Sequence, residues 1–482
     1  MKPYVDWTIR TEKMTEADLE KPGQTVTIST PCGPIKGLQY NGYKLFRGVR
    51  YADAERWEPA IPVTSWEGVY DATNWGPRPL QFKAYFGRPN TAINAFYAQE
   101  SLLEENEGNY SEAGSLNLNI WVPDHARNCP VLFYIHGGAF MNGSGTDPWI
   151  DGEAYAAHGV ILVSVNYRLG PWHQVAGDGY KGNLCLTDQI TAIQWVKNNI
   201  AAYGGNPERI VISGESAGAM SVQCLLFSPM LEEGMVAGGI IMSDGGSFFH
   251  RGTSASVEAA WNRVKERLGV QKIQDLKMLA PVDVYQAWAA SVNGDVDCIY
   301  PVINGESRTC SVQDALAENK IANVPVIFGF LADDMYPKEM YQQAVDFGKA
   351  RAAVGGNPTY IYYFNRKQIE PDGQSFSEFG AFHAADLFYL FGTLYRGCRP
   401  YTETDFRISK AMVDYISNFC LDGDPNGEGL AEWTPITEDS QACMNLGDAP
   451  CGMVDPDVAV LERQQERGIP FPYRKDWNQQ QP

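Results

Sequence analysis

Short runs of apolar, β-prone residues, separated by helical patterns, constrain the fold of this chain most. Several of them are almost entirely apolar and do not alternate between apolar and polar residues, as in GVILVSV at 159–165. Such a strand is buried on both faces, which is typical of a mainly parallel sheet with helices on each side. The sequence therefore predicts an α/β fold with candidate strands LNLNIWV (116–122), VLFYI (131–135), VILVSVNY (160–167), RIVIS (209–213), GGIIMS (238–243), VPVIFGF (324–330) and TYIYYF (359–364).

One long helix is predicted between two of these strands. In CLTDQITAIQWVKNNIAAYG, apolar residues such as Leu186, Ile190 and Ile193 recur at near-helical spacing. The pattern ends at Gly204 and Gly205, and glycine is the residue that most often terminates a helix.

A second helix-rich stretch, residues 255–295, lies between two predicted strands. We expect it to belong to an insertion, at about 245–323, that lies over the sheet edge and shapes a pocket. No internal repeat or long polar linker interrupts the chain, so residues 1–482 are predicted to form a single domain. Near the start, TVTIST and IKGLQY flank the turn PCGP and predict a β-hairpin.

The chain is strongly acidic, with a formal net charge of −20 at pH 7 over 482 residues. It has no basic stripe that could neutralise phosphates, so nucleic acid is not expected as a partner. The longest apolar stretches have the length of strands and are too short to span a bilayer, so no membrane partner is expected either.

The ten cysteines are scattered singly, with no C-x-x-C pair. We therefore expect free, mostly buried thiols and no metal or redox site. The first residues, MKPYVDWTIR, contain no apolar segment like that of a secretory signal. Both features favour a reducing, cytoplasmic compartment, and the oligomeric state stays open.

A G-x-S-x-G motif, Gly214-Glu215-Ser216-Ala217-Gly218, follows the predicted strand RIVIS and precedes the helical run AMSVQCLLF. In this context a sharp turn lifts the serine hydroxyl clear of the sheet, and small neighbours let the helix pack close behind it. Ser216 is therefore the candidate nucleophile. A plain glycine-rich turn without a catalytic role is the alternative.

The run YIHGGAF is the candidate oxyanion loop, because it follows the predicted strand VLFYI. A serine that attacks a carbonyl creates an oxyanion, which needs backbone N–H donors from the residue after the serine and from a loop after an earlier strand. We assign Gly138, Ala139 and Ala217 as these donors. Alternatively, His136, Gly137 and Gly138 simply end a strand.

Chain order restricts the other members of a triad, since an α/β-hydrolase sheet presents them as Ser, acid, His. Only His250 and His383 follow Ser216, and His250 comes too early to leave room for a strand and an acid. His383 is therefore the predicted general base. Asp333 and Asp334 both follow the predicted strand VPVIFGF. We prefer Asp334 as the acid that orients the base, with Asp333 as the alternative.

With these motifs the sequence resembles the type-B carboxylesterases, an α/β-hydrolase family that includes bacterial para-nitrobenzyl esterases, animal carboxylesterases and cholinesterases. The resemblance covers most of the chain. It rests on segments such as FRGVRYA (46–52), SWEGVYDAT (65–73), NYRLG (166–170) and IAAYGGNPERIVISGESAGAMSV (200–222). It implies an α/β-hydrolase fold with the triad and oxyanion donors named above.

The resemblance also implies supporting residues around the triad. Glu215 and Asp386 would be the carboxylates behind it, and Ser243 would join the same polar network. One departure concerns the acid, because many relatives have Glu followed by Gly where this chain has Asp334 and Met335. The shorter side chain must then be compensated by the position of its loop.

Two further expectations depend on the resemblance. The family's early disulfide is missing, since Ser115 replaces one cysteine and the region GPRPLQ lacks the other, which favours a cytoplasmic, bacterial enzyme. Residues 80–110 are expected to form the pocket rim, although plain packing is an equal alternative for their aromatic residues Phe82, Tyr85, Phe86, Phe96 and Tyr97.

The function expected from these residues is that of a serine carboxylesterase, which hydrolyses small-molecule carboxylic esters through an acyl-enzyme and needs no cofactor or metal. The same residues would serve a narrow-specificity thioesterase, lactonase or feruloyl-type hydrolase. A non-catalytic, cholinesterase-like binding module is the alternative from a different class.

Overall fold

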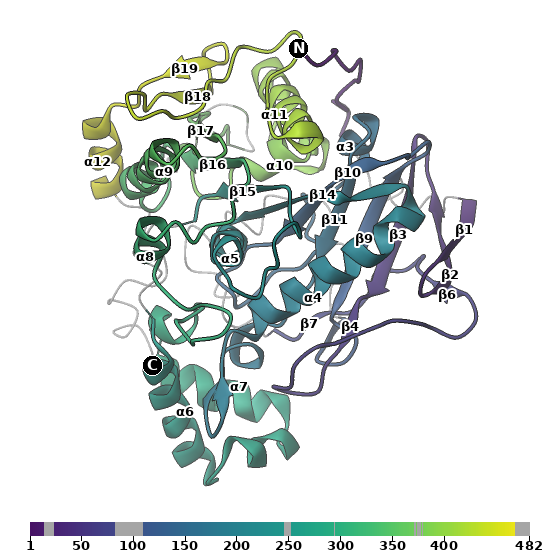
Figure 1. The fold of residues 1–482 in the computed structure, drawn as a ribbon, viewed down its shortest axis with the longest axis vertical. Coiled ribbons are helices and arrows are strands. Elements are labelled where there is room, and N and C mark those ends of the chain that lie inside the picture. The colour runs from purple at the N-terminus through teal and green to yellow at the C-terminus, as the bar shows by residue number, and fades with distance from the viewer. Residues whose placement is uncertain are drawn as a thin grey trace.

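The structure is a computed structural model that describes residues 1–13, 24–81, 109–244, 252–293, 295–370, 373, 377 and 379–467, and it is built around one large sheet (Figure 1). The strands of this sheet are β1 (Gln24–Thr30), β2 (Gly33–Gln39), β3 (Tyr43–Arg50), β6 (Tyr70–Asp71), β9 (Asn117–Pro123), β10 (Cys129–Ile135), β11 (Ile161–Val165), β14 (Gly205–Glu215), β15 (Gly238–Met242), β16 (Val326–Leu331), β17 (Thr359–Phe364), β18 (Cys443–Leu446) and β19 (Gly452–Val454). Their spatial order is β1-β2-β3-β9-β11-β10-β14-β15-β16-β17-β18-β19, with β6 paired to β2. Neighbouring strands from β11 to β18 pair in parallel. The strands at the two ends of this order pair antiparallel, and β6 pairs with β2 in parallel.

Short two-residue strands form small ladders beside the sheet. They are β4 (Ala52–Asp53) with β5 (Ile61–Pro62), β7 (Arg78–Pro79) with β8 (Tyr110–Ser111), and β12 (Ala176–Gly177) with β13 (Tyr180–Lys181). The helices are α3 (Glu153–Ala157), α4 (Leu184–Asn199), α5 (Ala217–Leu226), α6 (Ser254–Leu268), α7 (Pro281–Val292), α8 (Val312–Ala317), α9 (Pro337–Ala353), α10 (Leu387–Leu390), α11 (Glu403–Asp422) and α12 (Val458–Arg467).

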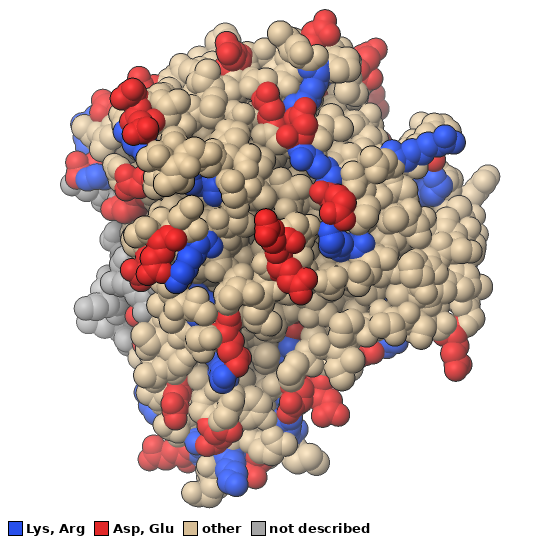
Figure 2. Space-filling view, in the orientation of Figure 1, with Lys and Arg blue, Asp and Glu red and all other residues tan. Residues whose placement is uncertain are grey.

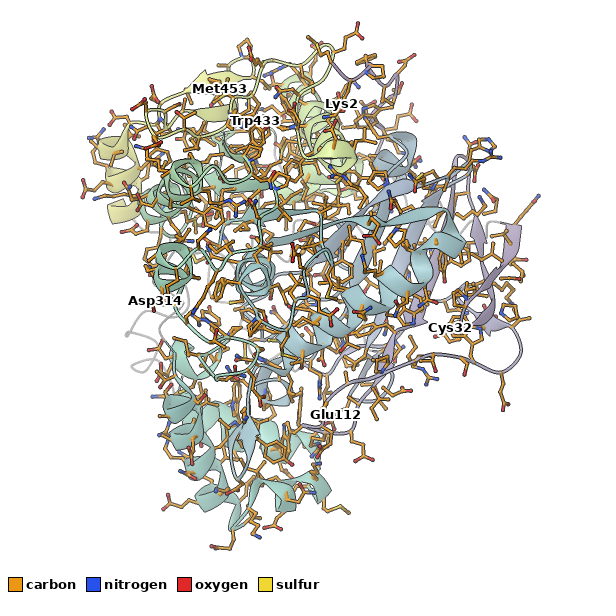
Figure 3. The ribbon with its side chains drawn as sticks, in the orientation of Figure 1. Lys2, Cys32, Glu112, Asp314, Trp433 and Met453 are labelled. Carbon is orange, nitrogen blue, oxygen red and sulfur yellow. The ribbon has the colours of Figure 1, made fainter. Side chains whose placement is uncertain are left out.

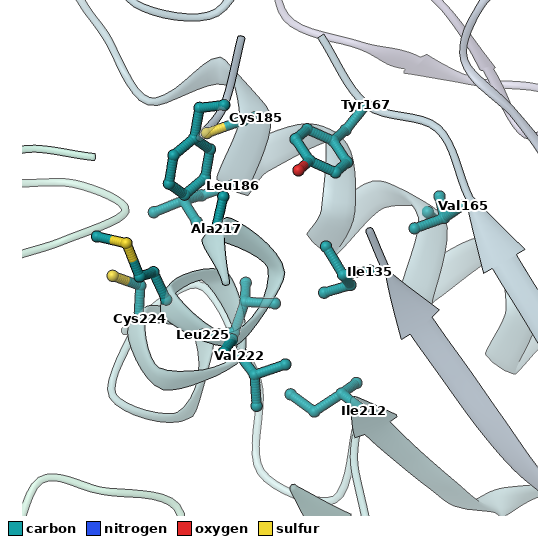
Figure 4. Packing of buried hydrophobic residues seen from close by; sticks show 14 of the residues in the cluster. Ile135, Val165, Tyr167, Cys185, Leu186, Ile212, Ala217, Val222, Cys224 and Leu225 are labelled. Atoms are coloured by element: carbon teal, nitrogen blue, oxygen red, sulfur yellow. The ribbon is translucent and has the colours of Figure 1, made fainter. Parts of the chain in front are cut away.

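Helices cover both faces of the sheet, which explains why its strands are apolar throughout. In β10 the side chains of Val131 and Phe133 pack in a core with α4, α5 and α9, whereas Leu132 and Tyr134 pack on the opposite face with α3 and α11. Figure 4 shows the first face from close by, with the α5 side chain of Val222 lying toward the sheet. The predicted α/β fold with a mainly parallel, doubly covered sheet is confirmed.

The predicted strands all lie in this sheet, with boundaries shifted by a few residues. The predicted hairpin is β1 and β2, and the predicted helix is α4 followed by a 3₁₀ turn at Ile200–Tyr203. Gly204 caps this turn with a φ of 85°, a left-handed conformation that glycine adopts without strain. Strands β3, β6, β18 and β19 are additions that the sequence patterns did not predict.

Helices α6, α7 and α8 lie between β15 and β16, within the expected insertion. Helix α6 packs against β12, and α7 packs against the 3₁₀ turn Gly170–Trp172. Both helices form the lower end of the molecule in Figure 1. That residues 1–482 form a single domain stays a prediction.

The N-terminal segment lies across α11 without regular secondary structure. Trp7 Nε1 donates a hydrogen bond of 2.6 Å to Asp414 Oδ1, and His158 Nε2 lies 2.7 Å from the same oxygen. Lys2 binds the carbonyl of Asp424, and Figure 3 shows its place beside α11. Asp414 thus joins the N-terminal segment to the end of α3 and to α11.

The charged surface is mixed. In the face drawn in Figure 2, Lys and Arg side chains lie interspersed with Asp and Glu. Among the described helices, none is long and apolar enough to cross a membrane. All ten cysteines are free thiols, and most of them are buried.

Candidate active site

Ser216 lies in a strained turn between β14 and α5. Its φ of 56° and ψ of −120° are unusual for a non-glycine residue, and its N–H is held by the carbonyl of Met242 at 2.9 Å. A Cβ on Gly218 would lie 2.0 Å from the carbonyl oxygen of Ile135, and one on Gly214 would lie 2.3 Å from the carbonyl carbon of Gly218. Only glycine therefore lets α5 pack this close behind the serine.

Three of the predicted site residues form one hydrogen-bonded line. His383 Nε2 lies 2.9 Å from Ser216 Oγ, and His383 Nδ1 lies 2.9 Å from Asp334 Oδ1. Because a carboxylate only accepts, the neutral imidazole carries its proton on Nδ1, and its Nε2 is then free to accept one from the serine. Ser216 comes from the β14–α5 turn, Asp334 from the loop after β16, and His383 from the loop after β17.

Asp334 is fully paired through both carboxylate oxygens. Oδ1 accepts the backbone N–H of Met335 at 2.7 Å in addition to His383, and Oδ2 accepts the hydroxyl of Ser243 at 2.7 Å. These contacts aim the short aspartate side chain at the imidazole. Ser243, predicted to join the network, is in direct contact with it.

Asp333, the alternative acid, points elsewhere. Its carboxylate accepts the backbone N–H of Ala381 at 2.8 Å, and its own N–H donates to the carbonyl of Ala381 at 3.1 Å. It therefore ties the loop that carries His383 to the end of β16. The structure brings Asp334, and not Asp333, to the imidazole.

The glycine loop, residues 137–143, lies against the serine turn. A Cβ on Gly137 would lie 3.1 Å from Ser216 Cβ and 2.7 Å from Glu215 Oε2. Gly138 and Ala139 have φ of 102° and 54°, and in the described chain neither backbone N–H donates a hydrogen bond. Ala217 is the first residue of α5, where backbone N–H groups have no partner within the helix. The three predicted donors therefore have N–H groups available for a ligand.

His136 fixes the orientation of one of these donors. Its Nδ1 lies 2.8 Å from the carbonyl oxygen of Gly137 and must carry the proton, because a carbonyl only accepts. The peptide between Gly137 and Gly138 is trans, so its N–H points away from this carbonyl and from the imidazole. Burial lowers the pKa of His136 to about 4, so the ring is neutral near pH 7. The ring stacks on Tyr167, with centroids 4.4 Å apart.

Buried charges surround His383. Burial alone disfavours the imidazolium, but the carboxylates of Asp334 and Glu215 outweigh it and raise the pKa of His383 to about 9. Glu215 Oε1 lies 3.2 Å from His383 Nε2 without the geometry of a hydrogen bond. Burial raises the pKa of Glu215 to about 8, against the attraction of His383.

Asp386 lies behind the site and is fully buried. Its Oδ2 accepts the hydroxyl of Tyr362 at 2.7 Å, and its Oδ1 has no hydrogen-bond partner in the part of the chain that the structure describes. Burial raises the pKa of Asp386 to about 6. It acts on His383 through its charge and makes no hydrogen bond to it.

Two expectations about the site fall on other parts of the chain. The aromatic rim residues Phe82, Tyr85, Phe86, Phe96 and Tyr97 lie outside the described residues. No group of three His, Cys, Asp or Glu side chains suited to a metal ion occurs within the described ranges. Sequence reasoning missed the roles of His136 and Asp333, whose partners are backbone atoms.

The chain matches known proteins along most of its length. The model of the carboxylesterase family matches residues 24–344 and 338–463. A para-nitrobenzyl esterase of Bacillus subtilis is 30% identical over 488 residues, which cover 87% of this chain and 94% of that protein. Human bile salt-activated lipase is 27% identical, over 85% of this chain and 64% of the lipase.

Solved structures agree with these matches. A carboxylesterase of Geobacillus stearothermophilus superimposes with a TM-score of 0.74 at 26% identity, over 91% of this chain and 99% of that one. A thermophilic para-nitrobenzyl esterase superimposes with a TM-score of 0.77 at 24% identity and has the same α/β-hydrolase fold. The chain belongs to the carboxylesterase family.

Proposed function

We propose that this carboxylic ester hydrolase works as a serine esterase in which Ser216 is the nucleophile, His383 the general base and Asp334 the acid that orients it. The observation that carries the proposal is the unbroken line from Asp334 through His383 to Ser216, with both contacts at 2.9 Å. The strained turn supports it, because it presents the hydroxyl at the end of a parallel sheet.

Acylation begins when Ser216 Oγ attacks the ester carbonyl carbon while its proton moves to His383 Nε2. The N–H groups of Gly138, Ala139 and Ala217 receive the oxyanion of the tetrahedral intermediate. The intermediate collapses, the bond to the alcohol oxygen breaks, and His383 returns the proton to the leaving alcohol. A water molecule then attacks the acyl-enzyme, with His383 as its base, and releases the acid and the free serine.

The remaining polar groups support the imidazolium that forms in both steps. Asp334 stabilises it directly, and Glu215 and Asp386 favour it in their ionised forms, in which their charges raise the pKa of His383. Ser243 holds Asp334 in place through its 2.7 Å hydrogen bond. These roles account for carboxylates at positions where an apolar core residue would pack more easily.

The substrate class that we propose is a small neutral or cationic carboxylic ester, because the chain carries a net charge of −20. We also propose a cytoplasmic, bacterial enzyme. Support comes from the ten free thiols, which are typical of a reducing compartment, and from the relative in Bacillus subtilis.

The first test measures initial rates on para-nitrophenyl esters from acetate to decanoate and on a feruloyl ester, for the wild type and for Ser216→Ala. A fluorophosphonate probe, which labels activated serines, is applied to both proteins. We expect turnover and labelling of the wild type and neither in the variant. Labelling without turnover would favour a narrow-specificity hydrolase. A folded wild type that is neither labelled nor active would contradict the proposal.

A further inference from the structure

A glutamine outside the triad is joined to the glycine loop by a pair of hydrogen bonds. Gln81 Nε2 donates to the carbonyl of Gly143 at 2.9 Å, and the N–H of Gly143 donates to Gln81 Oε1 at 3.0 Å. Gln81 Nε2 also lies 3.1 Å from the carbonyl of Pro79. The side-chain amide thus pairs with both polar groups of one loop residue, as a neighbouring strand would.

Gly143 in turn lies beside the hydrogen bond between His136 and the carbonyl of Gly137, which orients the N–H of Gly138. A Cβ on Gly143 would lie 2.6 Å from His136 Nδ1 and 2.6 Å from the carbonyl oxygen of Gly137. These are the two atoms of the 2.8 Å hydrogen bond that turns the Gly138 N–H away from the imidazole. There is therefore no room for a side chain between Gly143 and this bond, and the φ of 100° at Gly143 is one that glycine adopts readily.

The loop between these points is closed on itself. The N–H groups of Met141 and Asn142 both donate to the carbonyl of Gly138, at 2.9 and 3.1 Å. A Cβ on Gly138 would lie 2.3 Å from the backbone oxygen of Asn142. The side-chain Oδ1 of Asn142 would lie 2.2 Å from the same Cβ. A displacement of Gly143 is therefore transmitted to Gly138 through its neighbour Asn142, whose backbone and side chain both pack against Gly138.

We propose that Gln81 is a positioning residue for hydrolysis, which holds the glycine loop so that the Gly138 N–H faces the developing oxyanion. It does not touch the reacting atoms, and its effect passes through Gly143 and the bond between His136 and Gly137. The inference rests on the proposed function. It predicts that loss of Gln81 weakens binding of the transition state and leaves binding of the substrate unchanged.

The test compares Gln81→Ala with Gln39→Ala as a matched control. Gln39 also bonds through its side-chain amide to two backbone carbonyls, those of Tyr40 and Tyr43, but lies in β2 near the edge of the sheet. The readouts are kcat and KM on the best para-nitrophenyl ester and the inhibition constant of a trifluoromethyl ketone. This ketone forms a tetrahedral adduct with the serine and places an oxyanion in the loop.

For Gln81→Ala we expect kcat to fall by about 10- to 100-fold with KM nearly unchanged, because small misplacements of catalytic groups cost about 100-fold. Affinity for the ketone should fall by the same factor, and the control should change neither. An active wild type with Gln81→Ala equal to Gln39→Ala in kcat and ketone affinity would overturn the inference alone. An inactive, unlabelled wild type would instead overturn the proposed function.

Gln81→Glu supplies a second readout that a merely structural role would not move. A protonated carboxyl group can keep the paired bonds to Gly143, with its O–H as donor to the carbonyl and its other oxygen as acceptor of the N–H, and loses only the second donor, which faces Pro79. The ionised group only accepts and faces the carbonyls of Gly143 and Pro79. The ratio of its kcat to that of the wild type should therefore approach one at low pH and fall as the pH rises. A ratio that does not change with pH contradicts the proposal.

Discussion

Replacing Asp334 with Asn removes the charge of the carboxylate but keeps its shape. In a triad an amide at this position damages catalysis in two ways, by loss of charge and by stabilising the wrong tautomer of the histidine, and the second effect alone accounts for losses of about 10⁴-fold in kcat. Here the backbone N–H of Met335 donates to Asp334 Oδ1 at 2.7 Å. An amide nitrogen at that position would face this N–H, so the amide oxygen is held there.

The other amide group also finds a partner. The NH₂ of the new side chain would occupy the place of Oδ2 and donate to Ser243 Oγ, because a hydroxyl can accept as well as donate. His383 Nδ1–H then keeps an oxygen acceptor and the productive tautomer. What remains is the loss of attraction between the carboxylate and the imidazolium that forms during the reaction. For unit charges about 4 Å apart at an effective dielectric constant of about 20, this attraction is worth about 4 kcal/mol. The retained hydrogen bond offsets about 1 kcal/mol of this loss.

We therefore expect Asp334→Asn to lower kcat by about 10²-fold, and Asp334→Ala, which removes both acceptors, by about 10⁴-fold. The assay is single-turnover acylation on a para-nitrophenyl ester, followed as release of nitrophenolate, with circular dichroism to show that each variant is folded. Equal losses of kcat in the two variants would refute the reasoning. They would mean that the amide had flipped, so that its NH₂ faced His383 and stabilised the wrong tautomer of the imidazole.

Two further predictions follow from charges described above. Glu215→Gln removes one of the carboxylates that raise the pKa of His383 to about 9. Because only the neutral imidazole accepts the serine proton, the rising limb of the pH profile of kcat/KM should move to lower pH. A limb that stays in place or moves to higher pH contradicts this prediction. Asp414→Ala leaves the buried N–H of Trp7 and the imidazole of His158 without their shared acceptor. It should lower the free energy of unfolding, measured by urea titration, by about 2–4 kcal/mol and leave kcat unchanged. A loss below about 0.5 kcal/mol would show that the N-terminal segment is not held at this residue.

The sheet could be predicted because its central strands are covered on both faces. Runs such as VLFYI have no polar alternation that a solvent-exposed face would require, so they stand out in the sequence. Strand β3, YKLFRGVR, alternates irregularly and contains a glycine at which its register with β9 shifts. Strand β18 has four residues and is too short to carry a pattern. Their assignment depends on neighbouring strands that are distant in sequence.

The candidate site was predictable where chemistry requires a particular residue type in a particular context. Ser216 can be recognised by the glycines of its G-x-S-x-G motif, and His383 is the histidine that remains once chain order excludes the others. Asp333 and Asp334 are adjacent carboxylates after one strand, and only the turn after β16 sends one to the imidazole and the other to the backbone of Ala381. Gln81 shares no local pattern with its partner Gly143, because the pairing is made by the fold and involves backbone atoms.

Because the backbone of Ser216 has a positive φ, laboratory evolution for heat resistance and laboratory evolution for hydrolysis would favour different residues at this position. A serine at φ 56° and ψ −120° is held in a conformation that costs about 1–3 kcal/mol, and glycine would adopt it with little strain. A library screened for folding at high temperature alone would therefore enrich glycine at this position and yield a sturdier, inert protein. Selection on turnover after heating would keep the serine and direct the stabilising substitutions to other parts of the chain, such as the junction around Asp414.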